Sequence, residues 1–477
     1  MKRISTGNPK LDSILKGGFP ADSMNIIMGL PGTGKTILAQ QLIFHNATAE
    51  RPALYFSTAS EPLDKMLGYV QEFEFFDIAK IGEAIIYQDL NTILRTDGLA
   101  AAVSAIVDGI KEQQPALLVI DSFKALHSFA SSEREFRVQL SVLTAALSSL
   151  AITSFLVGEY AEEDVAALAE FAVADSVISL ILKPSGMQDS RHLRVTKLRG
   201  SDFFGGEHAF RIGPSGLNIF PRLATPTSPI SYELSQSRAL TGVAALDSML
   251  AEGFWAGSST VVFGPPGSGK TLLGLHFVFR GIEKGEKGII ATLQENPTQL
   301  ARIVAGFGWD LQAAIDSGML DLVYVSPIEV LIDEFVQDLI SLAKRRGAVR
   351  VMIDSLNDLN ASTDDTRRFR DYIYALTQIT AVEGISLIMT QEVRDLFATT
   401  VLSEYGVSHM SDNVVLLTYV REESRIKRAL AVIKTRASAH DPGIREFVIT
   451  PGGINVGQPF EQLHIHERQL VAGDEGG

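Results

Sequence analysis

Two glycine-rich stretches of this chain have residue types and spacing suited to holding phosphate groups. Each fits the pattern Gly-x-x-x-x-Gly-Lys-[Ser/Thr] and lies between an apolar run typical of a buried strand and an apolar segment typical of a helix. Glycines let the backbone curl so that its amides point at phosphate oxygens, and the following helix start adds its positive dipole end. The residues predicted to bind ATP are Gly29, Gly32, Thr33, Gly34, Lys35 and Thr36 in the first stretch, and Gly264, Gly267, Ser268, Gly269, Lys270 and Thr271 in the second.

The last residues of the two loops predict further chemistry. Lys35 and Lys270 are expected to reach the terminal phosphates and to take part in catalysis. Thr36 and Thr271 are expected to bind Mg²⁺ through their hydroxyl groups, because this ion prefers oxygen ligands beside the phosphates of a nucleotide. The alternative, a glycine-rich turn that binds nothing, is disfavoured because the motif occurs twice in the right context.

A second ligand for the metal is expected at the end of a neighbouring strand. Asp121 follows the apolar run Leu117–Ile120, and Asp354 follows the run Val349–Ile353. An aspartate in such a place can also be a simple turn residue. Because both halves of the chain have it at corresponding positions, we predict that Asp121 and Asp354 bind the metal.

The chain contains an internal repeat, which reorganises the interpretation of every motif. The segment Arg3–Gly7 recurs as Arg238–Gly242, a shift of 238 − 3 = 235 residues, and the two loops recur at the same shift. Later, Lys-Leu-Arg at 197–199 matches Lys-Thr-Arg at 434–436, where the shift is 434 − 197 = 237 residues. Order is kept throughout, so we predict two copies of one domain, at residues 1–227 and 236–469. Residues 222–237, rich in Pro, Ser and Thr, are the expected linker, and residues 470–477 are an expected disordered tail.

Within each copy, short apolar runs alternate with longer segments of helical spacing. This alternation predicts an α/β fold, with a mainly parallel sheet flanked by helices. In the first copy the expected strands are Met24–Met28, Ala53–Phe56, Leu117–Ile120 and Ser154–Val157, and the expected helices include Lys35–Asn46 and Arg134–Leu150.

Composition excludes several classes of function. The chain of 477 residues has no cysteine, which excludes disulfides and zinc thiolate sites. Its formal net charge of -14 and the lack of a basic arm argue against nucleic acid as a partner. No apolar run approaches the ~20 residues that cross a bilayer, and the N-terminus lacks a signal-peptide pattern, so we expect a cytoplasmic protein without a membrane partner.

Taken together, these motifs resemble the KaiC family of RecA-like ATPases. The resemblance rests on the Thr-Gly-x-x-x-Leu-Asp-Ser opening, the two loops, Ile-Asp-Ser, Lys-x-Arg and the closing Gly-x-Asn-Ile. It extends from about Ile4 to Phe460, with Ser411–Tyr419 and Ile444–Phe447 also in the manner of the family. It implies two tandem RecA-like P-loop NTPase domains, a homohexameric ring with ATP between subunits, slow hydrolysis, self-phosphorylation in the second domain, and a role in a circadian clock.

The Lys-x-Arg motifs indicate how a neighbouring subunit could complete each site. Two cations spaced two residues apart share one face of a strand and could neutralise charge on a neighbour's ATP. A solvated strand face is the alternative, and the resemblance favours the role in trans. The residues carried over for that role are Lys197, Leu198, Arg199, Arg428, Lys434, Arg436 and His440.

This chain departs from the family pattern at the position of the catalytic base. The family has two adjacent glutamates at the end of the second strand. The second repeat has Gln294-Glu295 there, whereas the first has Ala59-Ser60, with Glu61 one place late. We therefore predict that Glu295 is the catalytic base of the second domain and that the first domain hydrolyses ATP weakly.

The family's adjacent pair of phosphorylated residues is also incomplete here. Its equivalents are Ser408 and His409, so the serine is present and the threonine is not. The sequence therefore favours a hexameric, slow, Mg²⁺-dependent ATPase with a possible phosphosite at Ser408, acting in signalling or timing. Two alternatives stay open, namely a largely non-catalytic ATP-dependent scaffold and a DNA-associated motor, which the acidic composition disfavours.

Overall fold

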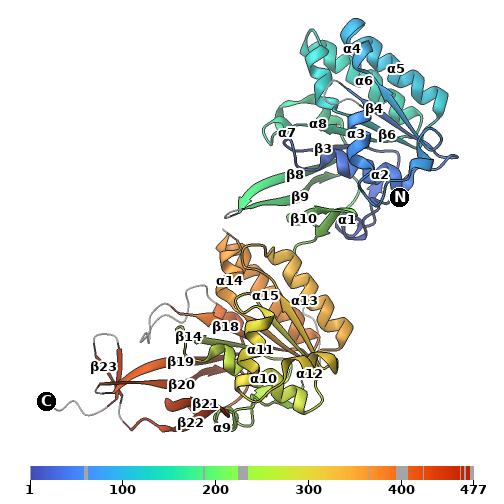
Figure 1. The fold of residues 1–477 in the computed structure, drawn as a ribbon. Coiled ribbons are helices and arrows are strands. Elements are labelled where there is room, and N and C mark those ends of the chain that lie inside the picture. Colours follow the sequence, from blue (N-terminus) through green and yellow to red (C-terminus); the bar gives the residue numbers. More distant parts are fainter. Residues whose placement is uncertain are drawn as a thin grey trace. The chain divides into compact units, whose positions relative to one another are not determined.

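The computed structural model describes two compact units, with their boundary between Arg222 and Leu223. The described residues are 2–58, 63–185, 188–223, 235–363, 365–393, 407–422, 424–461, 463–466 and 469–472. Each unit is a mainly parallel β-sheet with helices on both faces (Figure 1), as the alternating pattern predicted.

The first unit is built on a nine-stranded sheet in the order β11-β10-β9-β8-β3-β7-β6-β4-β5. Its strands from β8 to β5 in that order run parallel, whereas β9, β10 and β11 pair antiparallel. The strands are β3 (Met24–Met28), β4 (Ala53–Ser57), β5 (Ile85–Asp89), β6 (Leu117–Asp121), β7 (Thr153–Gly158), β8 (Ser176–Ser185), β9 (Gln188–Leu198), β10 (Glu207–Gly213) and β11 (Gly216–Phe220). The helices are α1 (Pro9–Ile14), α2 (Lys35–Asn46), α3 (Leu63–Val70), η1 (Ile78–Lys80), α4 (Asn91–Thr96), α5 (Gly98–Gln113), η2 (Phe123–Phe129), α6 (Glu133–Ser149), α7 (Asp164–Ala167) and α8 (Ala169–Val173).

The second unit repeats this sheet in the order β16-β15-β17-β18-β14-β19-β20-β21-β22, with the hairpin β23-β24 added beside β19. The strands are β14 (Ser259–Gly264), β15 (Gly288–Thr292), β16 (Leu320–Tyr324), β17 (Arg350–Asp354), β18 (Ser386–Glu392), β19 (Asn413–Glu422), β20 (Arg425–Thr435), β21 (Arg445–Thr450), β22 (Gly453–Pro459), β23 (Leu463–His466) and β24 (Gln469–Ala472). The helices are α9 (Ala244–Met249), α10 (Lys270–Glu283), α11 (Pro297–Gly306), α12 (Leu311–Asp316), α13 (Ile332–Arg346), α14 (Leu356–Ala361), α15 (Thr366–Val382) and α16 (Val407–Met410). A small two-stranded sheet opens each unit, formed by β1 (Arg3–Ile4) with β2 (Phe19–Pro20) and by β12 (Arg238–Ala239) with β13 (Phe254–Trp255).

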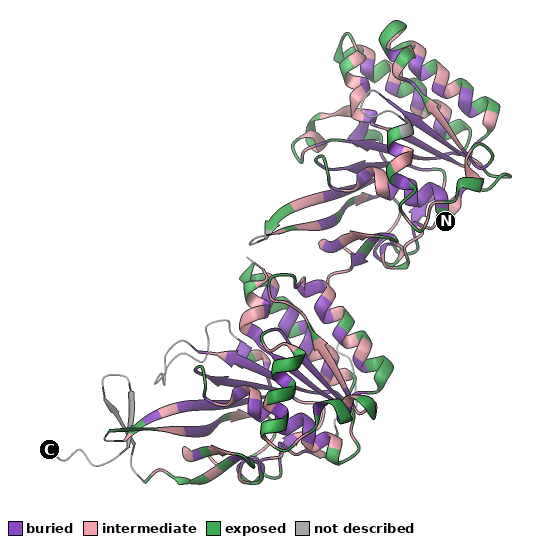
Figure 2. Ribbon diagram, viewed as in Figure 1, coloured by how far each residue is buried: buried purple, intermediate pink, exposed green. Residues whose placement is uncertain are grey.

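The central strands are buried on both faces, which explains their unbroken apolar sequence. Along β3, Ile27 packs with α2 on one side of the sheet, whereas Ile26 and Met28 pack with the helices on the other side. This alternation is the period of two that a strand imposes on its side chains. Figure 2 shows the result, with buried strands at the centre of each unit and exposed residues on the outer sides of the helices.

The expected elements agree closely with the structure. Helix α2 has the predicted bounds, and the predicted strands of the first copy appear as β3, β4, β6 and β7. Helix α6 begins one residue earlier than expected, because the side chain of Ser132 accepts a hydrogen bond from the backbone of Glu135 at 3.2 Å and caps the helix.

The expectation of a disordered tail from Leu470 is wrong for residues 470–472. They belong to β24, which pairs with β23 and with β19, and these backbone hydrogen bonds order the segment. Residues 473–477, residues 224–234 of the expected linker, and residues 59–62 lie outside the described part of the chain. None of the helices in the described part combines the length and the apolar character needed to cross a bilayer.

A side chain on the helix after each phosphate loop attaches a late strand of that unit, which is β11 in the first unit and β22 in the second. In the first unit, Gln41 accepts a hydrogen bond from the backbone of Leu217 at 3.1 Å. In the second unit, His276 occupies the corresponding position (276 − 41 = 235), and its Nε2 atom accepts from the backbone of Ile454 at 3.1 Å. His276 therefore has to be neutral at Nε2 to make this contact. Burial beside the Trp309 ring lowers the pKa of His276 from 6.5 to about 4.

This histidine predicts a specific sensitivity of the second unit to acid. The unfolded chain binds a proton at His276 near pH 6.5, whereas the folded chain does so only near pH 4. The stabilisation is therefore complete above pH 6.5 and is lost as the pH falls toward 4, at a cost of up to about 3 kcal/mol. We expect His276→Gln, which installs the residue of the first unit, to flatten the pH dependence of the unfolding free energy in this window. Denaturant unfolding of both proteins from pH 7 to 4 measures this, and parallel curves would contradict it.

Candidate active site

The first phosphate loop connects β3 to α2 in a conformation that needs glycine. Gly34 precedes the helix with φ of 98°, in the left-handed region that side chains disfavour. At Gly29 an added Cβ atom would lie 2.2 Å from the carbonyl oxygen of Leu180. In the second loop Gly269 has φ of 101° before α10, so both copies adopt the same turn. The loops therefore present helix N-termini and backbone amides at the carboxyl edge of each sheet, as an anion site requires.

The two loop lysines are buried without an acidic partner at hydrogen-bonding distance. Lys35 Nζ donates to the carbonyl of Leu30 at 2.9 Å, and Lys270 Nζ donates to that of Pro265 at 2.9 Å. Their side chains are 8% and 9% exposed, and this burial lowers the pKa of both ammonium groups. In the part of the chain that the structure describes, neither lysine has an ion pair. Phosphate oxygens would supply the missing negative charge.

A hydroxyl and a carboxylate meet beside each lysine, as the sequence predicted for the metal site. Thr36 Oγ1 donates to Asp121 Oδ2 at 2.7 Å, and Thr271 Oγ1 donates to Asp354 Oδ2 at 2.6 Å. Burial raises the pKa of both carboxyl groups, so a nearby cation would favour their ionised form.

These oxygen atoms fit Mg²⁺ bound together with a nucleotide. Mg²⁺ is commonly held by one or two protein oxygens, with water and phosphate oxygens completing its shell. The described residues contain no cluster of three or more His, Cys, Asp or Glu side chains that would hold a metal ion without a nucleotide. The donor set is thus suited to a metal that arrives with phosphate.

The first site opens into a cavity of about 640 Å³. One end is lined by Lys35, Thr36 and Asp121, and another part is lined by apolar and aromatic residues that include Tyr69 and Ile212. A polar end beside an apolar wall suits a ligand with a charged phosphate chain and a flat base.

Three residues near the predicted metal sites were missed in the sequence analysis. Tyr55 in β4 donates its hydroxyl to Asp121 Oδ2 at 2.9 Å. Glu159, directly after β7, lines the cavity of the first site, and Glu392, the last residue of β18, has the corresponding position in the second repeat. The sequence offered one signal for Glu159 and Glu392, because a glutamate follows the corresponding apolar run in both copies.

The predicted cationic pair of the first unit converges on the end of helix α8. Lys197 Nζ donates to the carbonyl of Phe171 at 2.9 Å, and Arg199 Nη2 donates to that of Ala172 at 3.0 Å. Lys197 lies in β9 and Arg199 directly follows the strand, so both side chains reach the same backbone segment. This agrees with the predicted shared face.

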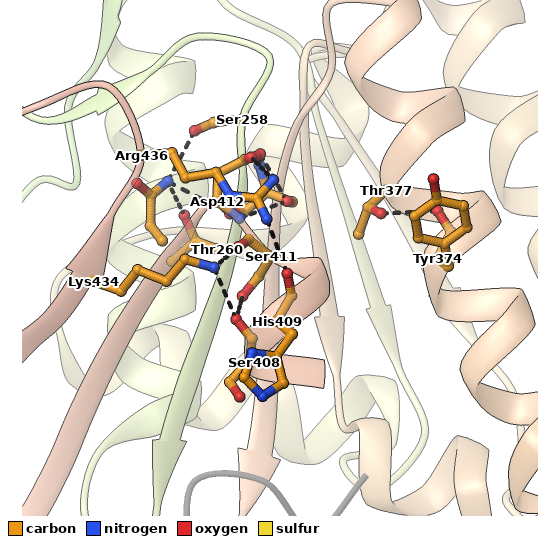
Figure 3. A network of polar contacts seen from close by, with 12 residues as sticks. Ser258, Thr260, Tyr374, Thr377, Ser408, His409, Ser411, Asp412, Lys434 and Arg436 are labelled. Carbon is orange, nitrogen blue, oxygen red and sulfur yellow. Dashed lines mark hydrogen bonds and ion pairs between the residues drawn. The ribbon is translucent and has the colours of Figure 1, made fainter. Parts of the chain in front are cut away.

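The second unit repeats this arrangement with different side chains at the helix end. Lys434 Nζ donates to the carbonyl of Ser408 at 3.0 Å, and Arg436 Nη2 donates to that of His409 at 3.0 Å. Figure 3 shows both cationic side chains directed toward this segment. Because 408 − 171 = 409 − 172 = 237, Ser408 and His409 take the places of Phe171 and Ala172.

Each cationic pair lies at the end of the sheet opposite its own phosphate loop. Asp175, whose carbonyl accepts from the backbone of Arg199 at 2.8 Å, also binds the backbone of Met24 at the start of β3 through its carboxylate. The loop follows the other end of β3, and a strand of this length extends roughly 13 Å. The cations thus lie away from the phosphates that their own loop would bind, while they are exposed enough to meet another molecule.

Other residues carried over for a role in trans are placed differently. The Leu198 side chain belongs to the core and is 5% exposed, so only its backbone is accessible. Arg428 lies near the loop of its own chain, because β20 places its Nε atom 3.4 Å from the carbonyl of Gly267. His440 lies in the loop after β20, where the backbone N–H of the neighbouring Asp441 donates to the carbonyl of Met249 at 2.9 Å.

The candidate base of the second unit lies shortly after the second strand of its repeat. The backbone of Glu295 donates to Thr292 Oγ1 at 3.1 Å in a turn directly after β15, and its side chain is partly exposed. Gln294 is exposed. In the first unit the corresponding Ala59, Ser60 and Glu61 lie outside the described residues.

Each unit has a phosphate loop at the carboxyl edge of its parallel sheet, with a buried lysine and a Thr–Asp pair. These features define a P-loop nucleotide-binding protein with tandem RecA-like domains. The family model for the KaiC ATPase matches this chain twice, over residues 4–224 and 239–461. The chain therefore belongs to the KaiC ATPase family.

Known members of the family resemble this chain along nearly its whole length. A circadian clock oscillator protein KaiC from Picosynechococcus sp. is 29% identical over 475 residues, which cover 96% of this chain and 90% of that protein. A circadian clock protein KaiC3 from Synechocystis sp. is 27% identical over 475 residues, covering 97% of this chain and 93% of that protein. The match includes both repeats, so the tandem arrangement is common to these proteins.

Proposed function

We propose that this protein is a slow, Mg²⁺-dependent ATPase that works as a homohexameric ring in signalling or timing. The supporting observation is the division of each site between two ends of the sheet. The phosphate loop and the Thr–Asp pair lie at the carboxyl edge of the sheet. The Lys-x-Arg pair lies near the start of the central strand that leads into this loop. Copies arranged head to tail would bring the pair of one subunit to the nucleotide of the next, and such an interface closes into a ring.

Nucleotide is expected to control assembly, because it would lie between the two surfaces. Mass measurement should find hexamers with ATP and Mg²⁺, and smaller species after nucleotide removal. Chemical analysis of the isolated rings should find up to two nucleotides per chain. A monomer that retains ATP at both loops would contradict the ring while leaving nucleotide binding intact.

In the second domain we propose Glu295 as the catalytic base. It lies in the turn after β15, the second strand of the repeat that keeps a glutamate at this place. The first domain is proposed to be the weaker hydrolase, since Ala59 and Ser60 cannot accept a proton.

Serine autophosphorylation is proposed for the second domain alone. Ser408 lies beside the cationic pair of that domain, whereas the first domain has Phe171 at the same place, without a hydroxyl group. After incubation with ATP and Mg²⁺, phosphopeptide mapping should find phosphate on Ser408, and Ser408→Ala should abolish it. Ser411, which is fully buried, should carry no label in either protein. Absence of label on Ser408 would contradict the proposal without affecting the ATPase.

A second candidate is a ring scaffold in which ATP binds subunits together and is not consumed. The replacement of both strand-end glutamates in the first repeat favours it for that domain. Phosphate release distinguishes the two functions, because a scaffold retains ATP in the ring and releases no phosphate.

A further inference from the structure

A carboxylate that the sequence motifs do not include lies near each loop lysine. In the first unit, Gly158 ends β7 opposite Met28, the residue before the loop, so Glu159 follows at the carboxyl edge of the sheet. In the second unit, Glu392 lies directly opposite Gly264 at the start of the second loop. Both glutamates therefore lie at the carboxyl end of the strand that runs between the loop strand and the strand that ends in the metal-site aspartate.

Glu159 faces the space where the terminal phosphate would lie. It lines the cavity of about 640 Å³ together with Lys35, Thr36 and Asp121. Its negative charge acts on Lys35 more strongly than that of Asp121 does, and Glu392 likewise precedes Asp354 in its effect on Lys270. Glu159 therefore lies near Lys35 and lines the same cavity.

The side chain of Glu159 is available, in contrast to that of Asp121. Asp121 accepts hydrogen bonds from Thr36 and from Tyr55. Among the described residues, no side chain or backbone group forms a hydrogen bond or ion pair with the Glu159 carboxylate, which is exposed to the cavity. The corresponding Glu392 has its backbone held on both sides by Asn357, whose Oδ1 accepts at 2.6 Å and whose Nδ2 donates at 3.3 Å. The unengaged carboxylate of Glu159, which borders the cavity, is suited to bind a water molecule.

We propose that Glu159 is the catalytic base of the first domain, which lacks a glutamate pair at the end of its second strand. This rests on the proposed ATPase function and names the group that activates the water. The oxygen of that water forms a bond to the γ-phosphorus, and the bond from this phosphorus to the β–γ bridging oxygen breaks. The proton of the water passes to the Glu159 carboxylate and then to solvent. The products are ADP and inorganic phosphate, and Lys35 neutralises part of the phosphate charge. Thr36 and Asp121 would hold a Mg²⁺ ion that adds positive charge there.

The test isolates the first domain in the full-length chain by Lys270→Ala, which removes nucleotide from the second site. In this background, ATP binding is measured by calorimetry and turnover by phosphate release. Glu159→Gln keeps the size and hydrogen-bonding ability of the side chain and removes its ability to accept a proton. We expect unchanged ATP binding with phosphate release at least ~100-fold slower. Glu162→Gln, the same change at an exposed position of the following loop, is the control and should behave as the background protein does.

Each outcome decides one question. Turnover that stays within about threefold after Glu159→Gln, or a background protein that binds ATP and releases no phosphate, would overturn the role of Glu159. A background protein that binds no ATP would instead overturn nucleotide binding by the first domain, and with it the proposed function. Slower turnover together with weaker binding would identify Glu159 as a binding residue and also contradict its role as base.

Discussion

Lys35→Ala combined with Lys270→Ala is expected to abolish nucleotide retention, while each single change removes about half of it. The two lysines lie in separate units, each inside its own loop and beside its own Thr–Asp pair. Loss of the ammonium leaves the terminal phosphates of ATP without their principal positive side chain. We expect binding at each altered site to be at least ~100-fold weaker, which is about 2.7 kcal/mol.

The same double variant should remain folded, because these lysines are costly to bury when no anion is present. Burial lowers the pKa of each ammonium, and in the described residues each has only a carbonyl at hydrogen-bonding distance. Nucleotide-free protein with both alanines should therefore unfold at a denaturant concentration equal to or above that of the nucleotide-free wild type. Lys111→Ala with Lys284→Ala removes two exposed lysines and is the matched control for charge. Full ATP retention in the double loop variant would refute the assignment of both sites.

Complementation between two inactive proteins is the second large expected effect. Arg436→Ala should inactivate the second domain, because its guanidinium is proposed to reach the ATP of the neighbouring subunit. Lys270→Ala should inactivate it by loss of the nucleotide. When equal amounts are mixed and reassembled with ATP, about one quarter of the interfaces combine an intact loop with an intact Arg436. Phosphate release above the sum of the two separate proteins is the expected result.

All these proteins keep the first domain intact, so its activity contributes to every measurement. Phosphate release by Lys270→Ala alone therefore gives the baseline rate of the first domain. The control partner for mixing is Arg346→Ala, which removes an arginine near β16, at the other end of the sheet from β20. Alone, this control should hydrolyse ATP at the wild-type rate. An absence of any gain on mixing, with reassembly verified by mass, would show that Arg436 does not act between subunits.

The placement of Arg428 illustrates that two arginines close in sequence can lie at opposite ends of a sheet. The residue lies on β20, opposite Tyr419 of β19, and Tyr419 donates its hydroxyl to the carbonyl of Pro266 at 3.1 Å. This antiparallel pairing brings Arg428 to the loop of its own chain. Arg436 directly follows the same strand, β20, and therefore lies at the opposite end of the sheet. Strand direction and register therefore place these two arginines at opposite ends of the sheet.

Local patterns in the sequence determined the elements and the phosphate loops. Short apolar runs predicted strands such as β3, and helical spacing predicted α2 with its observed bounds, because both periodicities arise from the backbone itself. The loop glycines, Lys35 and Thr36 were identifiable for the same reason, since their chemistry requires a fixed short spacing. The repeat extended each inference to the second unit.

Contacts between distant segments were decided only by the tertiary structure. Glu159 is 124 residues from Lys35 (159 − 35 = 124), and the parallel pairing of β7 with β3 brings it to the loop. His276 accepts from Ile454 because β22 packs against α10, and no local pattern distinguishes it from an ordinary core histidine. Such pairs depend on strand order and register, which are set by the packing of whole elements. A single sequence specifies the residues of a site, whereas the fold determines which of them meet.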